Sequence, residues 1–284
     1  MRFISSLLLV LTIGAVLPDA VAVAGDDRAD GAAYASPYRV RLPWPDDELI
    51  PDLFDGERGD PRLEAGIAQS AWYGPRVGAW GPWPRAYLPP AVAQDKSDDW
   101  KRARIVATAL RFLGYDYRHH HIPDWNPPAG WHVEKSGGVR HDGKGVDCSN
   151  FTAFVFNQGL GIAISSDVQK QAASQTAQLN GSGRSVAVTV IPTQDSAAKW
   201  AAVLKPGDLL YIRPRHRDSI SHVVIWIGAW GASSDDAPLI IDSHGADVRD
   251  ESGKLIPAGV QLRPFHANSW YATHADHALR LIGE

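Results

Sequence analysis

A single cysteine, Cys148, stands among the 284 residues of this chain. One thiol allows neither an internal disulfide bond nor a cysteine-rich metal cluster, so the fold has to be stabilised by a hydrophobic core. The composition supplies one, because 44% of the residues are hydrophobic and 21% are charged, which is typical of globular proteins and excludes disordered or collagen-like chains. Cys148 is therefore either a small buried apolar side chain or a reactive thiol.

The charge balance argues against a polyanionic partner. The chain has 28 basic and 32 acidic residues, a formal net charge of −4, and no long run of Lys or Arg. A nucleic acid would need a concentrated basic surface to bind. We therefore expect no nucleic acid partner.

The first 24 residues have the pattern of a secretory signal peptide. Arg2 precedes an apolar stretch at residues 4–17, and Ala-Val-Ala at residues 22–24 fits a small-residue cleavage site. The apolar stretch is shorter than the roughly 20 residues that cross a bilayer. We expect a secreted or periplasmic protein with no lipid-anchor cysteine and no integral membrane segment after cleavage. In an oxidising compartment cysteines normally occur in pairs, so a solitary one favours a functional thiol.

Residues 25–97 form a proline- and tryptophan-rich arm with little helical or strand periodicity. Proline at this density favours extended structure. The tryptophan rings, among them Trp44, Trp72 and Trp80, indicate that the arm covers an apolar surface. Two interpretations remain open: an arm packed on the following domain, or a small recognition module for carbohydrate or peptide.

Regular structure is predicted from about Ser97 onward. Apolar residues at helical spacing predict a helix from residue 98 that Gly114 ends, and a second helix that begins at Cys148, with Asp147 as N-cap, and ends at Gly159. Short β-branched runs then predict strands at residues 208–212, 222–227 and 239–242. Helices followed by strands indicate an α+β domain with a largely antiparallel sheet.

Cys148 at a helix start suits nucleophilic chemistry. A thiol attacks as the thiolate, and the N–H groups and partial positive charge of a helix N-terminus favour that form. The same N–H groups can stabilise an oxyanion on a bound carbonyl. His222, at the head of a predicted strand, is the candidate base, since such pairs are adjacent in space rather than in sequence.

A third group should orient the imidazole of His222. Alternation places His222, Val224 and Trp226 on one face of their strand, and we expect the helix that carries the thiol to pack on this face. In the next strand Asp242 and His244 share a face. Alternation does not choose between them, and both remain candidates.

Three segments in this order resemble the NlpC family of papain-like cell-wall cysteine peptidases: residues 145–151 (GVDCSNF), 204–210 (LKPGDLL) and 221–228 (SHVVIWIG). The family pattern is an Asp-Cys-Ser-Gly-Phe nucleophile helix, a Pro-Gly-Asp strand entry and a His-Val-x-Ile-x-x-Gly strand. The resemblance covers roughly residues 98–284, because residues 269–282 are similar to the closing segment of the family. It implies a papain-like α+β domain, with the nucleophile at a helix start packed on an antiparallel sheet, after a signal peptide (1–24) and the arm (25–97).

The resemblance also implies an activity, the hydrolysis of amide bonds in peptidoglycan stem peptides, often between γ-linked D-glutamate and the following diamino acid. Cys148 matches the nucleophile, His222 the general base, and Tyr117 a tyrosine that faces the substrate. Strand register points to Asp242 as the third residue, whereas the family's frequent histidine there favours His244, which we place first.

Asn150 stands where the family usually has Gly, and residues 118–121 (RHHH) replace a Gly-Gly pair. These departures bear on substrate choice more than on the nucleophile. Two other functions stay open: a non-catalytic wall-peptide-binding protein that uses the arm, and an amidase or acyltransferase that uses the same Cys/His pair.

Several histidines near residue 120 are candidate metal ligands. Alternate residues of His119, His120 and His121 could bind a metal ion together with His132 or His141. The sequence has no His-Glu-x-x-His pair, and imidazoles lining the cleft are the simpler interpretation. We therefore expect no metal and no cofactor.

Overall fold

The computed structural model describes residues 34–53, 86–118 and 145–283. Within these ranges helices dominate the first half and strands the second, and the domain is α+β with an antiparallel main sheet, as the sequence predicts. The proposed signal peptide and residues 119–121, 132 and 141 lie outside the described residues. None of the described helices is long and apolar enough to cross a membrane.

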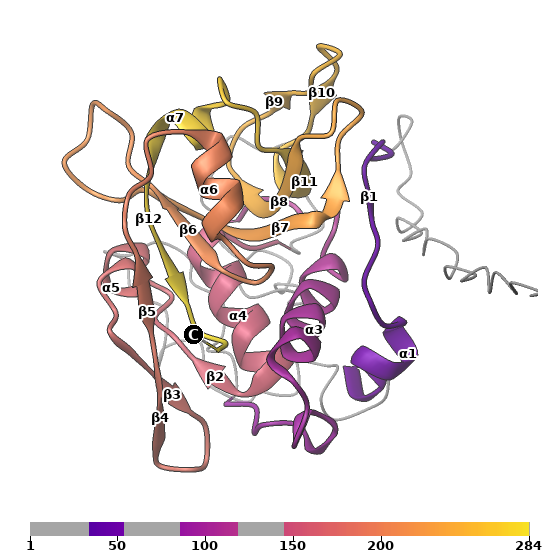
Figure 1. Cartoon of the computed structure of the whole chain (residues 1–284), viewed down its shortest axis with the longest axis vertical. Coiled ribbons are helices and arrows are strands. Elements are labelled where there is room, and N and C mark those ends of the chain that lie inside the picture. The colour runs from indigo at the N-terminus through magenta and orange to yellow at the C-terminus, as the bar shows by residue number, and fades with distance from the viewer. Residues whose placement is uncertain (1–33, 54–85, 119–144, 284) are drawn as a thin grey trace, which may run out of the picture.

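Six α-helices and two 3-10 turns are present in the described ranges (Figure 1). The helices are α1 (Asp46–Leu49), α3 (Asp98–Leu110), α4 (Cys148–Leu160), α5 (Val168–Ala172), α6 (Ala197–Val203) and α7 (Trp270–His274), and the 3-10 turns are η1 (Pro51–Leu53) and η4 (Ala91–Ala93).

The main sheet has seven strands in the order β11-β8-β7-β6-β12-β5, with β1 added to the far end of β7. All of its pairings are antiparallel. Its strands are β1 (Arg39–Val40), β5 (Thr189–Ile191), β6 (Leu209–Ile212), β7 (His222–Ala232), β8 (Pro238–His244), β11 (Gly259–Pro264) and β12 (Ala275–Arg280). Two small sheets join β2 (Ile162–Ala163), β3 (Thr176–Leu179) and β4 (Arg184–Ala187), and β9 (Val248–Arg249) and β10 (Leu255–Ile256).

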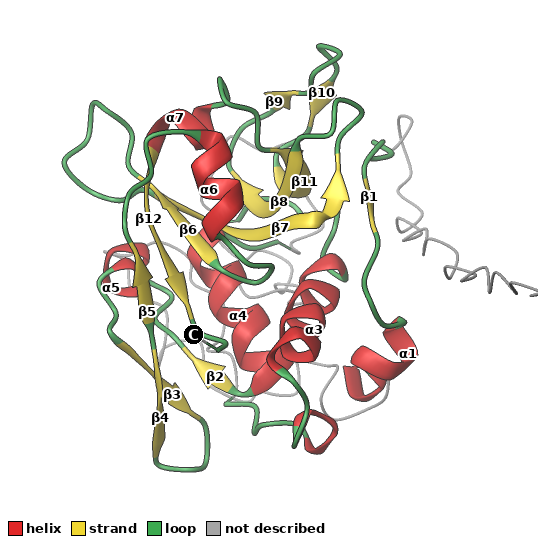
Figure 2. Ribbon diagram, viewed as in Figure 1, coloured by secondary structure: helices red, strands yellow, loops and turns green. Residues whose placement is uncertain are grey.

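Alternation along β7 divides the core between the two faces of the sheet. Val223, Ile225 and Ile227 pack into the larger cluster with the apolar residues of α3 and α4. Val224 and Trp226 pack into a second cluster with residues of α6 and α7. Figure 2 shows α3 and α4 on one side of β7 and α6 on the other. The expectation that the thiol helix packs on the His222 face is therefore wrong, because α4 covers the odd-numbered face.

The end of α4 also differs from its predicted position. The helix continues through Gly159 to Leu160, and Gly161 is the C-cap with a left-handed φ of 69°. Gly159 is a packing position instead, since a Cβ there would lie 3.0 Å from Cδ1 of Ile105 in α3. Sequence alone could not distinguish these two glycines, because both follow the apolar stretch and only packing decides between them.

The described parts of the arm lie against the domain. Leu49, Ile50 and Tyr87 are buried and belong to the same hydrophobic cluster as α3 and α4. Arg104 of α3 donates to both carboxylate oxygens of Asp52 at 2.8 Å. Short elements, β1, α1, η1 and η4, therefore occur in a stretch where proline spacing gave no periodicity, because contact with the domain stabilises them.

Candidate active site

Several side-chain hydrogen bonds around the N-terminus of α4 hold Cys148 in place. Asp147 accepts a hydrogen bond from the backbone N–H of Asn150 at 2.9 Å, and the side-chain amide of Asn150 donates to the same carboxylate at 2.9 and 3.0 Å. Ser149 Oγ donates to the carbonyl of Ser166 at 2.6 Å. Asn150 stands where the family pattern has Gly, and its hydrogen bonds hold the carboxylate of Asp147, the N-cap residue that precedes the thiol. Cys148 itself is buried, with 6% of its surface exposed.

The chain just before Cys148 is tied to two other segments. Val146 donates to the carbonyl of Asp116 at 3.0 Å and accepts from the N–H of Arg118 at 3.3 Å. Ser243 of β8 donates through its hydroxyl to the carbonyl of Val146. Gly145 is required here, because its φ is +156° and a Cβ would lie 2.6 Å from the carbonyl oxygen of Asp116. The thiol is therefore positioned by the backbone on both sides.

Cys148 and His222 meet where their elements begin. His222 is the first residue of β7, Cys148 is the first residue of α4, and their side chains form a hydrogen bond. On its other side, Nε2 of His222 lies 2.5 Å from Oδ2 of Asp242. Since Nε2 faces the carboxylate, Nδ1 is the ring nitrogen left for the thiol.

The Asp242 carboxylate has three side-chain partners and is fully buried. Besides His222, it accepts a hydrogen bond from Nε of Arg263 in β11 at 2.8 Å and from the hydroxyl of Tyr271 in α7 at 2.9 Å. Arg263 is equally buried and also donates to the carbonyls of Pro257 and Gly259. The carboxylate is thus bound by an imidazole, a guanidinium and a phenol, each from a different element.

Arg263 and Tyr271 were not among the residues singled out from the sequence. Tyr271 lies in the segment (269–282) that resembles the family's closing segment, but nothing in that pattern marks its hydroxyl. Arg263 follows Pro257 and Gly259 in a stretch without a strong strand pattern. Register supplies the signal that was missing: β11 pairs with β8 so that Gln261 lies opposite Asp242, which brings Arg263 within reach of the carboxylate.

His244 lies beside His222, but Asp242 and not His244 is the hydrogen-bond partner of the His222 ring. The His244 ring packs edge-to-face on the His222 ring, with centroids 5.2 Å apart. Its Nδ1 is instead 2.8 Å from the carbonyl oxygen of Ala246. Alternation put both Asp242 and His244 on the correct face, but the carboxylate reaches Nε2 of His222 and the second imidazole turns toward its own loop.

Tyr117 lies at the same end of the sheet. The residues on either side of it bond to the strand-like segment at Val146, two residues before Cys148. Its ring contacts Gly245, the residue after His244, where a Cβ would lie 3.3 Å from Cε1 of Tyr117. The structure thus gathers all five predicted site residues around the starts of α4 and β7 and the end of β8.

The pKa values of His222, Asp242 and His244 depend on one another's charges. Burial lowers the pKa of His222, but the charge of Cys148 and the hydrogen bonds to Asp242 and Cys148 outweigh it and raise this pKa to about 10. Burial raises the pKa of Asp242, yet the adjacent guanidinium of Arg263 and the His222 imidazole hold it well below its usual range. Burial lowers the pKa of His244. At neutral pH the geometry thus favours a charged His222, an ionised Asp242 and a neutral His244.

No group of three or more potential metal ligands is found in the part of the chain that the structure describes. The histidines that the sequence offers as candidate metal ligands (119–121, 132 and 141) lie outside those ranges. What the described residues assemble is a thiol, an imidazole and a carboxylate in hydrogen-bonded series, which is the arrangement of a nucleophile, a base and an orienting group.

The domain is α+β, and the Cys-His-Asp series lies where α4, β7 and β8 meet. Residues 135–270, just under half of the chain, match the model of the NlpC/P60 family, so the chain carries a domain of this family there. The matched range includes Cys148, His222, Asp242 and His244 and begins after Tyr117.

Solved structures with similarity to the chain carry the same family name. An NlpC/P60 family protein from Bacillus cereus ATCC 10987 aligns with a TM-score of 0.36 and 19% identity over 63% of this chain and 39% of that protein. The NlpC/p60 domain of the peptidoglycan hydrolase SagA aligns with a TM-score of 0.33 and 21% identity over 63% of this chain and 97% of that domain. NlpC1 from Trichomonas vaginalis has a TM-score of 0.36 and 14% identity over 67% of this chain and 47% of that protein. No curated protein matches the sequence.

Proposed function

We propose that this protein is a cysteine peptidase that hydrolyses amide bonds in peptidoglycan stem peptides outside the cytoplasm. The observation that carries the proposal is the contact of Cys148, at the start of α4, with His222, which Asp242 holds from the other side at 2.5 Å. The match of residues 135–270 to the NlpC/P60 family supports the substrate class. Release through a signal peptide at residues 1–24 is part of the same proposal.

In the first step, the thiolate sulfur of Cys148 attacks the amide carbonyl carbon. The backbone N–H groups of Cys148 and Ser149 at the start of α4 have no intrahelical acceptors and would stabilise the developing oxyanion, whereas the N–H of Asn150 is bound by Asp147. The imidazolium of His222 gives its proton to the leaving nitrogen as the C–N bond breaks. An acyl-enzyme thioester and a free amine result.

In the second step, neutral His222 takes a proton from water, and the hydroxide attacks the thioester carbonyl. The C–S bond breaks, the carboxylic acid leaves, and the thiolate–imidazolium pair is restored. Asp242 fixes the ring orientation through Nε2, so that Nδ1 faces the thiol in both steps. Tyr117, whose ring lies beside Gly245, is proposed to contact the substrate near the thiol.

The bond that we propose is the one between γ-linked D-glutamate and the following diamino acid. The test is digestion of purified peptidoglycan by the full chain, with mass spectrometry of the released fragments. Wild-type protein should release fragments with a new amine on the diamino acid, and Cys148→Ala should release none above background. Unchanged digestion by Cys148→Ala would overturn the proposal. Cleavage of a different amide bond would favour the amidase alternative over the peptidase.

Thiol reactivity distinguishes the enzyme from a binding protein with the same fold. A thiol activated by His222 should react with iodoacetamide at neutral pH much faster than a free cysteine, despite its burial. The matched control is His222→Ala, which should react slowly. A thiol that is equally inert in both proteins, together with retained wall binding, would support the non-catalytic alternative.

A further inference from the structure

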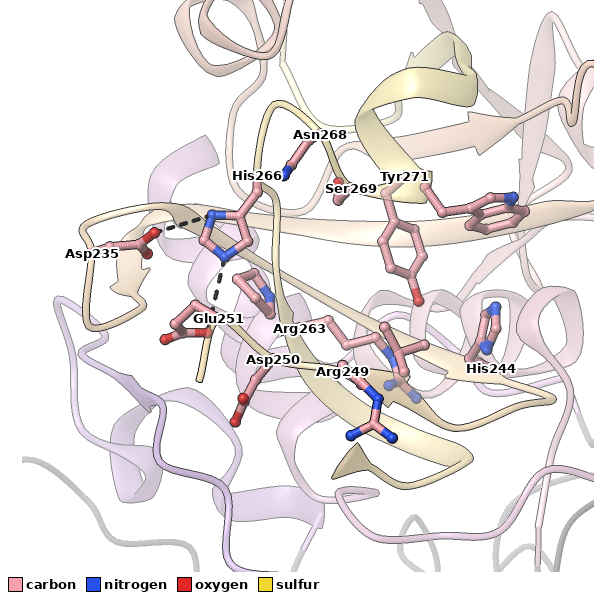
Figure 3. Close-up of a pocket in the computed structure, with 13 residues that line it drawn as sticks. Asp235, His244, Arg249, Asp250, Glu251, Arg263, His266, Asn268, Ser269 and Tyr271 are labelled. Carbon is pink, nitrogen blue, oxygen red and sulfur yellow. Dashed lines mark ion pairs between the residues drawn. The ribbon is translucent and has the colours of Figure 1, made fainter. Parts of the chain in front are cut away.

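Arg263 of β11 is a fully buried cation that binds the carboxylate of Asp242. Its Nε donates to Oδ1 at 2.8 Å, whereas Nε2 of His222 and the hydroxyl of Tyr271 lie 2.5 and 2.9 Å from Oδ2. Figure 3 shows the side chains of Arg263, Tyr271 and His244 at one end of a pocket of about 750 Å³ that they help to line. The two oxygens of the carboxylate are therefore divided between the guanidinium and the imidazole.

Strand register brings Arg263 to this carboxylate. Gln261 lies opposite Asp242 in the β8–β11 pair, and Arg263 is two residues further along the same face. A diagonal neighbour of this kind lies about 7–8 Å away, so a long side chain is needed to reach across. At its far end, Nη2 of Arg263 donates to the carbonyls of Pro257 and Gly259 at 3.0 and 3.3 Å. The guanidinium is thus held on both sides, and it fixes the orientation of the carboxylate that it binds.

One donor of Arg263 is left unpaired. Its Nη1 is buried and has no hydrogen-bond partner within the described residues. A buried donor without an acceptor destabilises the fold, so a side chain placed for stability alone would be expected to pair it. Such local costs are typical of functional sites. The placement of Arg263 is therefore explained better by its effect on Asp242 than by its contribution to stability.

The guanidinium also sets the charge of Asp242. Burial raises the pKa of this carboxyl group, and the charge of Arg263 is the largest opposing contribution that holds the pKa well below its usual range. Without the cation, a carboxylate with no exposed surface would favour its protonated, neutral form. A neutral Asp242 gives no counter-charge to an imidazolium at His222. The charge of His222 during the proposed reaction therefore depends on Arg263.

Several other titratable groups lie around this ion pair. Burial raises the pKa of Tyr271 and of Tyr34 in the arm, and burial lowers the pKa of His244, so all three are neutral near neutral pH. The groups that face Asp242 or Arg263 from the packed elements are His222 (β7), His244 (β8), Tyr271 (α7), Cys148 (α4, through His222) and Tyr34 (arm). Among them, only His222 and Cys148 change charge in the proposed reaction, and Arg263 remains a constant positive charge beside them.

We propose that Arg263 is a positioning residue of the Cys148–His222–Asp242 series. Its guanidinium keeps the Asp242 carboxylate ionised and turned so that Oδ2 faces His222, and it acts on the reaction through this carboxylate. The inference rests on the proposed peptidase function, because that function requires His222 to hold and release a proton.

Two substitutions separate charge from geometry. Arg263→Gln removes the charge, and we expect kcat on stem peptides to fall by about 10- to 100-fold with a nearly unchanged KM. Asp242 should then take up a proton at higher pH, so the acidic limb of the pH–rate profile should move up by about 1 pH unit or more. Arg263→Lys keeps the charge but cannot hold Oδ1 and both carbonyls together. We expect its kcat to fall by about 3- to 10-fold and its acidic limb to stay near that of wild type.

The rate at which iodoacetamide alkylates Cys148 gives the acidic limb without a substrate. This limb should move to higher pH in Arg263→Gln and stay in place in Arg263→Lys. An unmoved limb in Arg263→Gln, or a wild-type kcat in Arg263→Lys, would overturn the proposal. If Arg263→Gln does not fold, the kcat of Arg263→Lys decides alone.

The matched control is Arg280→Gln, since Arg280 binds the buried carboxylate of Asp208 through Nε and Nη2. This control should lower the free energy of unfolding in urea, leave kcat of the folded protein within about threefold and leave the acidic limb in place. If the Arg263 variants behave in the same way, Arg263 is structural only and the proposal is wrong. If wild type cleaves no stem peptide and the alkylation limb still moves in Arg263→Gln, the peptidase proposal fails and the role of Arg263 stands.

Discussion

Two buried carboxylates in this domain have similar surroundings and different consequences. Asp208, at the entry to β6, accepts hydrogen bonds from Arg102 of α3 at 3.1 Å and from Nη2 of Arg280 in β12 at 2.8 Å. Asp242, in β8, accepts from Arg263 at 2.8 Å and lies 2.5 Å from His222. Both carboxylates are fully buried.

The difference lies in what else each carboxylate touches. The side-chain partners of Asp208 in the described part of the chain are guanidinium groups, which stay charged at any physiological pH. The cluster is therefore electrically fixed, and it ties α3, β6 and β12 together. Asp242 has one guanidinium, one phenol and an imidazole that reaches the thiol. Asp242 thus has a histidine partner where Asp208 has its second arginine. Unlike the arginine, this histidine can exchange a proton with the thiol.

The largest effect should follow from Asp242→Asn, which keeps the shape and removes the charge. We expect kcat/KM on stem peptides to fall by about 100- to 10,000-fold, the usual range for an impaired acid–base group. The carboxylate raises the pKa of His222, so its loss should lower that pKa and move the alkaline limb of the pH–rate profile to lower pH. A profile with an unchanged alkaline limb would contradict the assignment of Asp242 to His222.

The same substitution at Asp208 should act on stability instead. Asp208→Asn leaves Arg102 and Arg280 buried without a counter-charge, and we expect a loss of about 3 to 5 kcal/mol in the free energy of unfolding, measured with urea. The kcat/KM of the folded fraction should stay within about threefold, since both guanidinium groups bond to Asp208 and lie in a cluster separate from His222 and Cys148. A catalytic loss as large as that of Asp242→Asn would remove the distinction between the two clusters.

The smallest effect should come from Tyr271→Phe, which removes one donor to Asp242 and keeps the ring. The lost hydrogen bond of 2.9 Å should cost about 1 kcal/mol, seen as a roughly fivefold fall in kcat/KM or as an equal loss of stability. A double variant with Asp242→Asn should show less than the sum of the two effects, because the hydroxyl acts through the carboxylate. Full additivity would show that Tyr271 acts elsewhere.

Much of the site follows from local sequence patterns. The N-cap at Asp147, the helix that starts at Cys148 and the strands that begin near His222 and Leu239 are set by residues close to each other in the chain. Short-range hydrogen bonding and side-chain alternation are sufficient to produce them. Tyr117, in contrast, was singled out through the resemblance to the family, and it lies beside the end of β8.

Other features could not be inferred because they depend on contacts between distant segments. Alternation left Asp242 and His244 equivalent, and only the three-dimensional positions of Nε2, Arg263 and Tyr271 separate them. The face covered by α4 was predicted wrongly for a similar reason, since a strand pattern shows which residues share a face but not which helix packs there. The short elements of the arm exist through contact with the domain, which proline spacing does not reveal.

By itself, the sequence determined the α+β class, the solitary thiol at a helix start, and the strand faces on which His222, Asp242 and His244 lie. These properties depend on spacing along the chain. The tertiary structure decided that Asp242 rather than His244 faces His222, and that Arg263 and Tyr271 complete the side-chain partners of Asp242. These depend on strand register and side-chain direction, which only the packing of the whole domain fixes.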